Sequence, residues 1–93
     1  VELGEGSQVM AGAILQTGII LGVNTIVNTA ASIDHDSVIG DHCHIAPGAT
    51  LCGNVSVGAG SHIGAGAVII QGAQINEGSL IKSATQSHTR LGE

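Results

Sequence analysis

A strict six-residue periodicity constrains the fold of this chain more than any other feature of its sequence. Every sixth residue from Leu3 to Ile81 is Leu, Ile or Val, at fourteen successive positions without a slip. The residue four places after each aliphatic is small in eleven hexads, and the exceptions are Ile19 and Val55. Each hexad therefore directs two side chains toward one interior.

The residue three places after each aliphatic marks a corner of the chain. This position holds Gly in eight hexads and Asn in two, and both residue types tolerate a positive φ angle. A short strand with alternate side chains inward and a corner every six residues closes most simply as a three-sided coil of 18 residues, stacked on its neighbours. We predict an all-β parallel β-helix of a little over four coils in residues 1–82, and a polar C-terminal tail in residues 83–93.

Charge and composition narrow the function classes. The formal net charge is −5, with Lys82 and Arg90 as the two fixed cations, so we expect no nucleic-acid partner. No apolar run approaches the roughly 20 residues that span a bilayer, so we expect no membrane partner and a cytoplasmic location. Cys43 points inward and Cys52 outward in the predicted register, which favours two reduced thiols. The chain opens at Val1 inside a repeat, and we expect it to be part of a longer protein.

Three successive hexads depart from the corner rule. Their corner positions hold Ala30, Asp36 and His42, and departures from a local rule tend to mark functional sites. The alternative is that Asp and His merely fill corners, since both tolerate positive φ. His35 lies outside at one of these corners, between Asp34 and Asp36. An imidazole, with an ordinary pKa of about 6.5, suits a general base that an adjacent carboxylate orients, and Asp36 is the first choice for that carboxylate, Asp34 the second.

A second group of side chains lies on an outer face. His44 and His62 are one coil apart and therefore in register, with Ile26 and Leu80 continuing the column. They form either a solvent-facing column or a subunit or ligand surface. Because His35 and His44 are half a coil apart, they cannot meet on one rod, and a site that uses both must lie between subunits. We expect self-association, most simply as a homotrimer.

Glycines form another outward column in the predicted register. A stripe of glycine on a flat wall lets a partner backbone or a narrow ligand approach closely. We therefore expect this column to be open to such an approach; it contains Gly4, Gly22, Gly40 and Gly58.

The segment VNTAASIDHDSVIGDHCHIAPGATLCGNVSVG, residues 27–58, resembles the active segment of bacterial sugar acetyltransferases that modify sialic acid or amino sugars such as bacillosamine. The resemblance implies a left-handed coil, trimers with sites between subunits, and acetyl-CoA as the acyl donor. It makes His35 the general base for direct attack of a sugar hydroxyl or amine on the thioester, with Asp36 orienting the ring. It places His44 near the thioester and Gly53 where backbone approaches the cofactor.

On the substrate side, we assign Asn28 and Asp34 to the sugar or nucleotide-sugar groove. The acceptor sugar, and whether its nitrogen or its oxygen is acetylated, stay open.

Two rival functions compete with acetyl transfer. A metal site is suggested by His42 and His44 on either side of Cys43, but the register points Cys43 into the coil and His44 out, so we expect no metal. The non-enzymatic alternative is a structural or oligomerisation solenoid that is a fragment of such an enzyme. Binding of acetyl-CoA by the isolated chain discriminates between a packing module and an enzyme.

Overall fold

The computed structural model describes residues 1–85, so most of the predicted polar tail lies outside the described residues. The described part contains no helix, and thus none that is long and apolar enough to cross a membrane. It consists of fourteen strands of two residues each: β1 Glu2–Leu3, β2 Gln8–Val9, β3 Ile14–Leu15, β4 Ile20–Leu21, β5 Ile26–Val27, β6 Ser32–Ile33, β7 Val38–Ile39, β8 His44–Ile45, β9 Thr50–Leu51, β10 Ser56–Val57, β11 His62–Ile63, β12 Val68–Ile69, β13 Gln74–Ile75 and β14 Leu80–Ile81.

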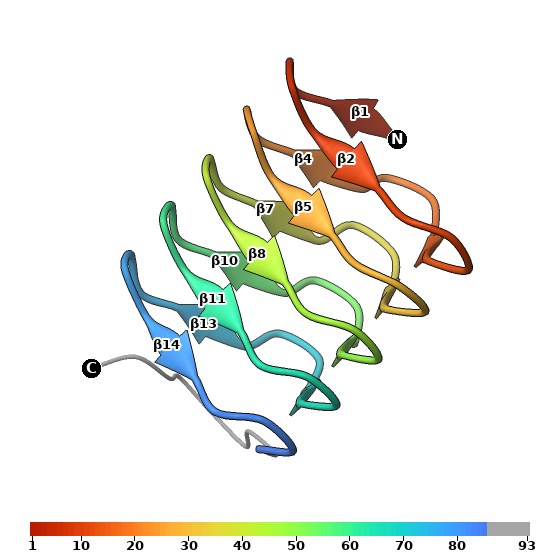
Figure 1. Cartoon of the computed structure of the whole chain (residues 1–93). Coiled ribbons are helices and arrows are strands. Elements are labelled where there is room, and N and C mark those ends of the chain that lie inside the picture. Colours follow the sequence, from red (N-terminus) through yellow and green to blue (C-terminus); the bar gives the residue numbers. More distant parts are fainter. Residues whose placement is uncertain (86–93) are drawn as a thin grey trace.

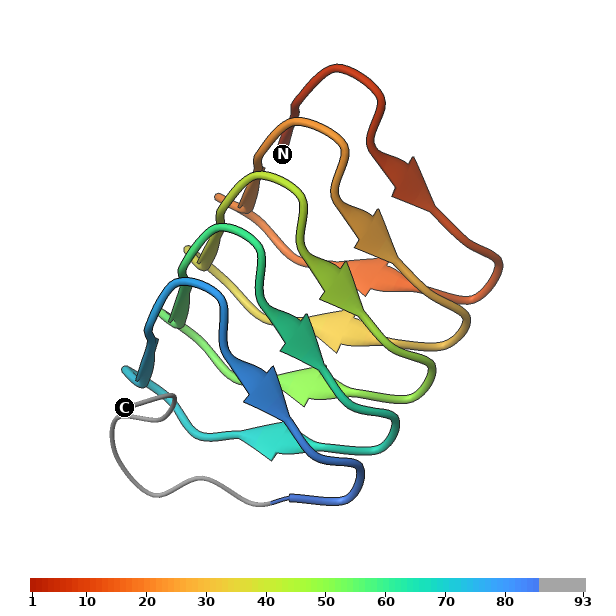
Figure 2. The same ribbon diagram turned by 60° about the vertical axis from the view of Figure 1, so that its left-hand side comes forward.

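The strands stack into three parallel sheets that form the sides of a triangular rod (Figure 1 and Figure 2). Face A has the order β1-β4-β7-β10-β13, face B has β14-β11-β8-β5-β2, and face C has β12-β9-β6-β3. Pairs such as Leu3 with Leu21 join each residue to the one a full coil later. The predicted left-handed parallel β-helix is confirmed, with the register that the six-residue repeat implied.

The inward aliphatic column forms the core. Central members such as Ile33, Ile45 and Ile63 are completely buried. At the first coil, by contrast, Leu3 and Val9 are 56% and 40% exposed, because no coil within residues 1–85 covers their side. Burial in this fold therefore comes from the neighbouring coils as much as from the residue's own coil.

The corners adopt the backbone conformation that the sequence predicted. All eight corner glycines have positive φ, and so do Asn24, Asn54 and the three departures Ala30, Asp36 and His42. Ala84, with a φ of 60°, continues the series beyond Lys82. The coil geometry extends through Thr85, whose carbonyl accepts a hydrogen bond from the N–H of Val68 at 2.8 Å.

Small polar side chains bridge consecutive coils at the corner between face A and face B. The hydroxyl of Thr25 donates to the carbonyl of Gly40 at 2.7 Å and accepts from the N–H of Cys43 at 3.3 Å. The thiol of Cys43 lies in the same column and donates to the carbonyl of Gly58 at 3.2 Å. Both cysteines are free, and burial raises the pKa of the Cys43 thiol. At this corner the interior therefore contains a ladder of satisfied hydroxyl and thiol groups.

The glycine column packs closely against the next coil, while Gly40 and Gly58 also line an open hollow on face A, so its openness to a partner stays a prediction. A Cβ atom on Gly40 would lie 2.9 Å from the Cα of Ala59, and one on Gly58 would lie 2.7 Å from the Cα of Glu77. The missing side chains thus make room for the next coil of the same chain. Paired strands lie roughly 4.7 to 4.9 Å apart, which leaves no room for a methyl group between the backbones of successive coils in this column.

These contacts predict two different costs for adding one methyl group. Gly60→Ala meets no atom within 4 Å but keeps a φ of +74°, so we expect a loss of about 1–2 kcal/mol in the free energy of unfolding. Gly58→Ala collides with backbone of the next coil, and we expect a larger loss because that backbone cannot move without breaking coil stacking. Urea unfolding of the two variants measures the difference; equal losses would contradict the stacking role.

Candidate functional site

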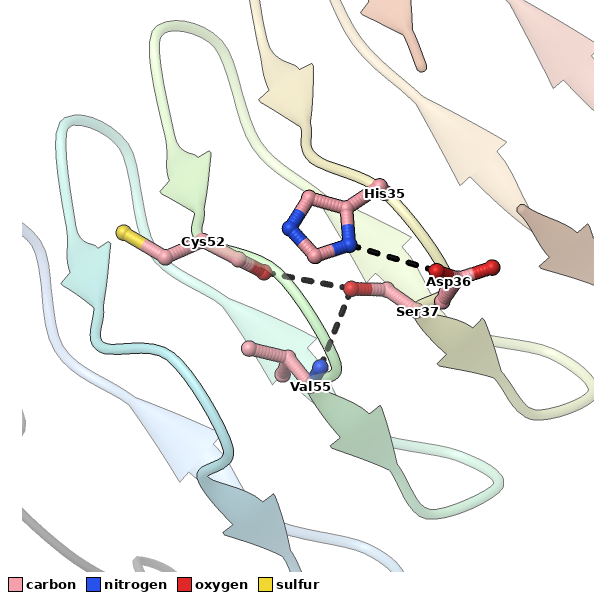
Figure 3. Close-up of polar contacts among 5 residues, drawn as sticks. All are labelled: His35, Asp36, Ser37, Cys52 and Val55. Carbon is pink, nitrogen blue, oxygen red and sulfur yellow. Dashed lines mark hydrogen bonds and ion pairs between the residues drawn. The ribbon is translucent and has the colours of Figure 1, made fainter. Parts of the chain in front are cut away.

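His35 and Asp36 form a dyad at the corner between face C and face A. The corner follows β6 and leads into β7, and both side chains are solvent-exposed, 47% and 61% respectively. Nδ1 of His35 lies 3.2 Å from Oδ2 of Asp36 (Figure 3). Because the carboxylate accepts only when Nδ1 carries the proton, the contact leaves Nε2 as the acceptor nitrogen of a neutral ring. This geometry is what a general base requires.

Asp36 rather than Asp34 contacts the ring. Asp36 adopts a φ of 59°, and its carboxylate leans across the preceding coil over Gly18, in the space that a Cβ there would take. The carboxylate of Asp34 is exposed and makes no hydrogen bond within residues 1–85. Its assignment to the substrate groove stays a prediction.

The imidazole of His35 leans the other way, over the following coil. It covers the buried Gly53, and a Cβ on this glycine would lie 2.6 Å from Cε1 of the ring. The backbone N–H of Asn54 also donates to the carbonyl of His35 at 2.9 Å. Gly53 therefore forms the surface on which the imidazole packs, which we call the seat of His35. The sequence did not reveal this local role.

Asn28 and His44 form a second cluster, at the edge of face B. The side-chain nitrogen of Asn28 lies 3.1 Å from Nε2 of His44. The amide orientation follows from its oxygen, which accepts the backbone N–H of Thr29 at 2.7 Å. The amide N–H₂ must then donate to Nε2, and the proton of the neutral His44 ring lies on Nδ1. The structure thus joins Asn28 to His44, not to the His35 corner.

His62 stacks on His44 in the next coil, as the register predicted. Their strands pair in parallel, and the ring centroids lie 4.7 Å apart with a tilt of 57°. Desolvation lowers the pKa of His44, and the neighbouring His62 adds to this effect. Both causes keep His44 neutral near pH 7, in agreement with the hydrogen bond from Asn28.

The two clusters lie on different sides of the rod. The dyad occupies the corner between face C and face A, and His44 belongs to face B, which is opposite that corner. Gly53, where the resemblance implied that backbone approaches the cofactor, lies beneath the ring of His35, and its contact with the cofactor stays a prediction. An open hollow of about 550 Å³ on face A, between Val38 and Glu77, contains none of the predicted site residues.

The arrangement around Cys43 does not resemble a metal centre. Its thiol is buried in the coil interior, while His42 is exposed at a corner and His44 lies on the outer face. Among residues 1–85, no three His, Cys, Asp or Glu side chains come close enough to hold a metal ion.

Ser37, close to the dyad, is a residue that the sequence did not single out. The hydroxyl of Ser37 contacts the turn of the following coil that contains Gly53 (Figure 3). The sequence does carry a sign of this role: in the inward column of this corner, Ser37 is polar, whereas the other members are Ile19, Val55 and Ala73.

The Asn28–His44 contact predicts how a carboxylate would act there. In Asn28→Asp, an oxygen replaces the donor, and a negative charge beside Nε2 raises the pKa of His44. In the native protein the pKa of His44 is lowered, so folding favours the neutral ring. The contribution of His44 to the free energy of unfolding is therefore present above the ordinary imidazole range and is lost as the pH falls. NMR titration of the His44 ring tests this: Asn28→Asp must raise the midpoint more than Asn28→Ala, which removes the donor without adding a charge, and an unchanged midpoint in Asn28→Asp would count against the hydrogen bond.

The seat of His35 predicts a local effect of one methyl group. Gly53→Ala fills the space under the imidazole, and the ring must swing away from Asp36 because it is the movable partner. We expect a changed Cε1–H resonance of His35 with little change in the free energy of unfolding, within about 1 kcal/mol. The resonance is assigned by its absence in His35→Ala. An unchanged His35 resonance would refute the contact.

Comparisons with known proteins agree with this fold. Residues 36–71 match the family described as bacterial transferase hexapeptide (six repeats). The acetyltransferase domain of PglB from Neisseria gonorrhoeae is 39% identical over 97% of the present chain, with a TM-score of 0.95. A structure of the same domain in complex with acetyl coenzyme A is equally similar. PerB from Caulobacter crescentus, in complex with CoA and GDP-perosamine, is 30% identical over 92% of the chain, with a TM-score of 0.76.

A third similar structure is WeeI from Acinetobacter baumannii, 28% identical over 99% of the chain with a TM-score of 0.70. The chain spans 44%, 47% and 49% of the PglB domain, PerB and WeeI, respectively. No curated protein sequence matches the chain. With its six-residue repeat and its three-sided coil, the chain contains the hexapeptide repeat of the family matched by residues 36–71, and it resembles the left-handed β-helices of sugar acetyltransferases.

Proposed function

We propose that this chain transfers an acetyl group from acetyl-CoA to the amino group of a nucleotide-linked amino sugar, with His35 as the general base. The observation that carries the proposal is the exposed dyad, in which Asp36 holds Nδ1 of His35 and leaves Nε2 free. The likeness to an acetyltransferase domain that binds acetyl coenzyme A supports the donor. The likeness to a perosamine N-acetyltransferase in complex with GDP-perosamine supports an amine as the acceptor.

The reaction requires one proton acceptor and one direct displacement. The sugar nitrogen attacks the carbonyl carbon of the thioester, and Nε2 of His35 takes the proton that the nitrogen loses. The tetrahedral intermediate collapses to the amide, and the CoA thiolate leaves and recovers a proton from the His35 imidazolium. Asp36 stabilises that imidazolium and keeps the ring in the correct tautomer between the two steps.

The Asn28–His44 pair suits the thioester side of the reaction. A neutral His44 with its proton on Nδ1 is a hydrogen-bond donor without a positive charge. Such a donor stabilises the oxygen of the thioester as negative charge develops on it. In this assignment Asn28 fixes the tautomer of His44 and does not bind the sugar directly.

The complete site lies between subunits of a homotrimer. His35 and His44 lie on different sides of one rod, so the dyad of one subunit meets the His44 cluster of the next. The exposure of the dyad supports this arrangement, because a catalytic base needs cover that excludes water from the reacting atoms. Gly53 and Asp34 then line the edge of the intersubunit groove. Two unpaired thiols favour the cytoplasm as the location.

An acetyl-transfer assay tests the proposal. The native chain is incubated with acetyl-CoA and a panel of nucleotide-linked amino sugars and sialic acids, and release of the CoA thiol is measured. We expect transfer to an amino sugar, and a fall of about 100-fold or more in kcat for His35→Ala because the proton acceptor is lost.

The matched control is His42→Ala. His42 is exposed at a corner with a φ of 57°, a conformation that Ala30 also adopts, and we expect its removal to leave activity unchanged. Both variants are compared at the same oligomeric state. Absence of transfer by the native chain, or equal rates for native protein and His35→Ala, would refute the catalytic assignment and leave a structural solenoid as the better description.

A further inference from the structure

We infer that Ser37 is a positioning residue for His35: its buried hydroxyl fixes the turn of the next coil on which the imidazole lies. The inference rests on the proposed function for its catalytic consequence. Ser37 is completely buried, so it cannot contact the substrate, and any effect on the reaction must pass through another residue.

The hydroxyl of Ser37 inserts into the turn from Cys52 to Val55. It donates to the carbonyl of Cys52 at 3.2 Å and accepts from the N–H of Val55 at 3.0 Å (Figure 3). These two backbone groups flank Gly53 and Asn54. One side chain therefore holds both ends of the turn that carries the seat of His35.

The next coil shows what this turn looks like without a hydroxyl. At the equivalent corner, the N–H of Ala73 donates directly to the carbonyl of Ile70 at 3.2 Å. Val55 stands in the column above Ala73, so there is no hydroxyl to intervene. In the Cys52–Val55 turn, the oxygen of Ser37 bonds to both of the groups whose counterparts bond to each other in the Ile70–Ala73 turn.

The position of this hydroxyl along the rod is specific. At the corner between face A and face B, polar side chains bridge coil after coil, as Thr25 and Ser61 do. At the corner between face C and face A, the inward column is otherwise aliphatic, and Ser37 is the one polar member in residues 1–85. The exception occurs in the hexad of the dyad and acts on the turn that supports it.

The contacts of His35 connect this turn to the dyad. The ring covers Gly53, and the carbonyl of His35 accepts the N–H of Asn54, so both the side chain and the backbone of His35 bear on the turn held by Ser37. In Ser37→Ala the carbonyl of Cys52 and the N–H of Val55 lose the hydroxyl that joins them. We expect the turn to rearrange and the imidazole to shift relative to Asp36 and the substrate.

Comparison of Ser37→Ala with Ser61→Ala tests the inference. Ser61 is buried to the same extent and makes the same two bonds, to the carbonyl of Asn76 and from the N–H of Ser79, but the turn it holds contains no site residue. We expect Ser37→Ala to lower kcat about tenfold, with each KM within about twofold, because the base is misplaced rather than the substrate released. We expect Ser61→Ala to match the native protein in both parameters.

Rescue and a spectroscopic readout separate positioning from general loss of stability. Ser37→Thr keeps the hydroxyl, in the manner of Thr25, and must restore kcat. The Cε1–H resonance of His35 must shift in Ser37→Ala and stay at its native position in Ser61→Ala. Unfolding by urea measures the stability that each alanine variant loses. Because the carbonyl of Asn76 keeps the hydroxyl of Ser79 as a donor in Ser61→Ala, we expect this variant to lose no more stability than Ser37→Ala.

The two hypotheses fail in different ways. If the native chain transfers no acetyl group, the proposed function is refuted, while the role of Ser37 in placing the ring is still decided by the His35 resonance. If the resonance and kcat of Ser37→Ala equal those of Ser61→Ala, the positioning role is overturned even though the enzyme is active.

Discussion

Backbone hydrogen bonding between successive coils is the constraint on which the rest of this structure depends. Each strand pairs in parallel with the strands one coil before and after it, so residues 18 apart stand in a column. This register buries the aliphatic core. It also places each outer side chain of a central coil beside the residues one coil before and one coil after it. His35 consequently stands directly over the corner of Gly53, and His44 over His62, without any long loop to place them.

Coil stacking gives the glycines of the rod two different roles. In the column that includes Gly40 and Gly58, a missing side chain lets the next coil of backbone approach. At Gly18 and Gly53 it leaves space for functional side chains of an adjacent coil, the carboxylate of Asp36 and the ring of His35. The dyad is thus supported on both sides by positions without a Cβ, which lets two exposed side chains hold one geometry.

The rod divides its chemistry between two sides. At one corner an imidazole is held by a carboxylate, an environment suited to accepting a proton. On the opposite face, desolvation and a second histidine lower the pKa of His44, while Asn28 donates to it, an environment suited to a neutral donor. A straight, hydrogen-bonded coil cannot bend to unite the two sides. Association of subunits is therefore part of the proposed mechanism, not merely a source of stability.

The sequence alone determined the strands, the corners and the inward column, because these depend on local preferences that repeat every six residues: aliphatic burial and tolerance of positive φ. It also located His35 and His44 on different sides. The sequence ranked Asp36 ahead of Asp34 as the partner of His35, and the tertiary structure supplied the contact between them. Only the tertiary structure joined Asn28 to His44 and gave Ser37 its place beneath the dyad. Those outcomes depend on side-chain directions and on contacts between residues 15 to 18 apart in sequence, which no single hexad encodes.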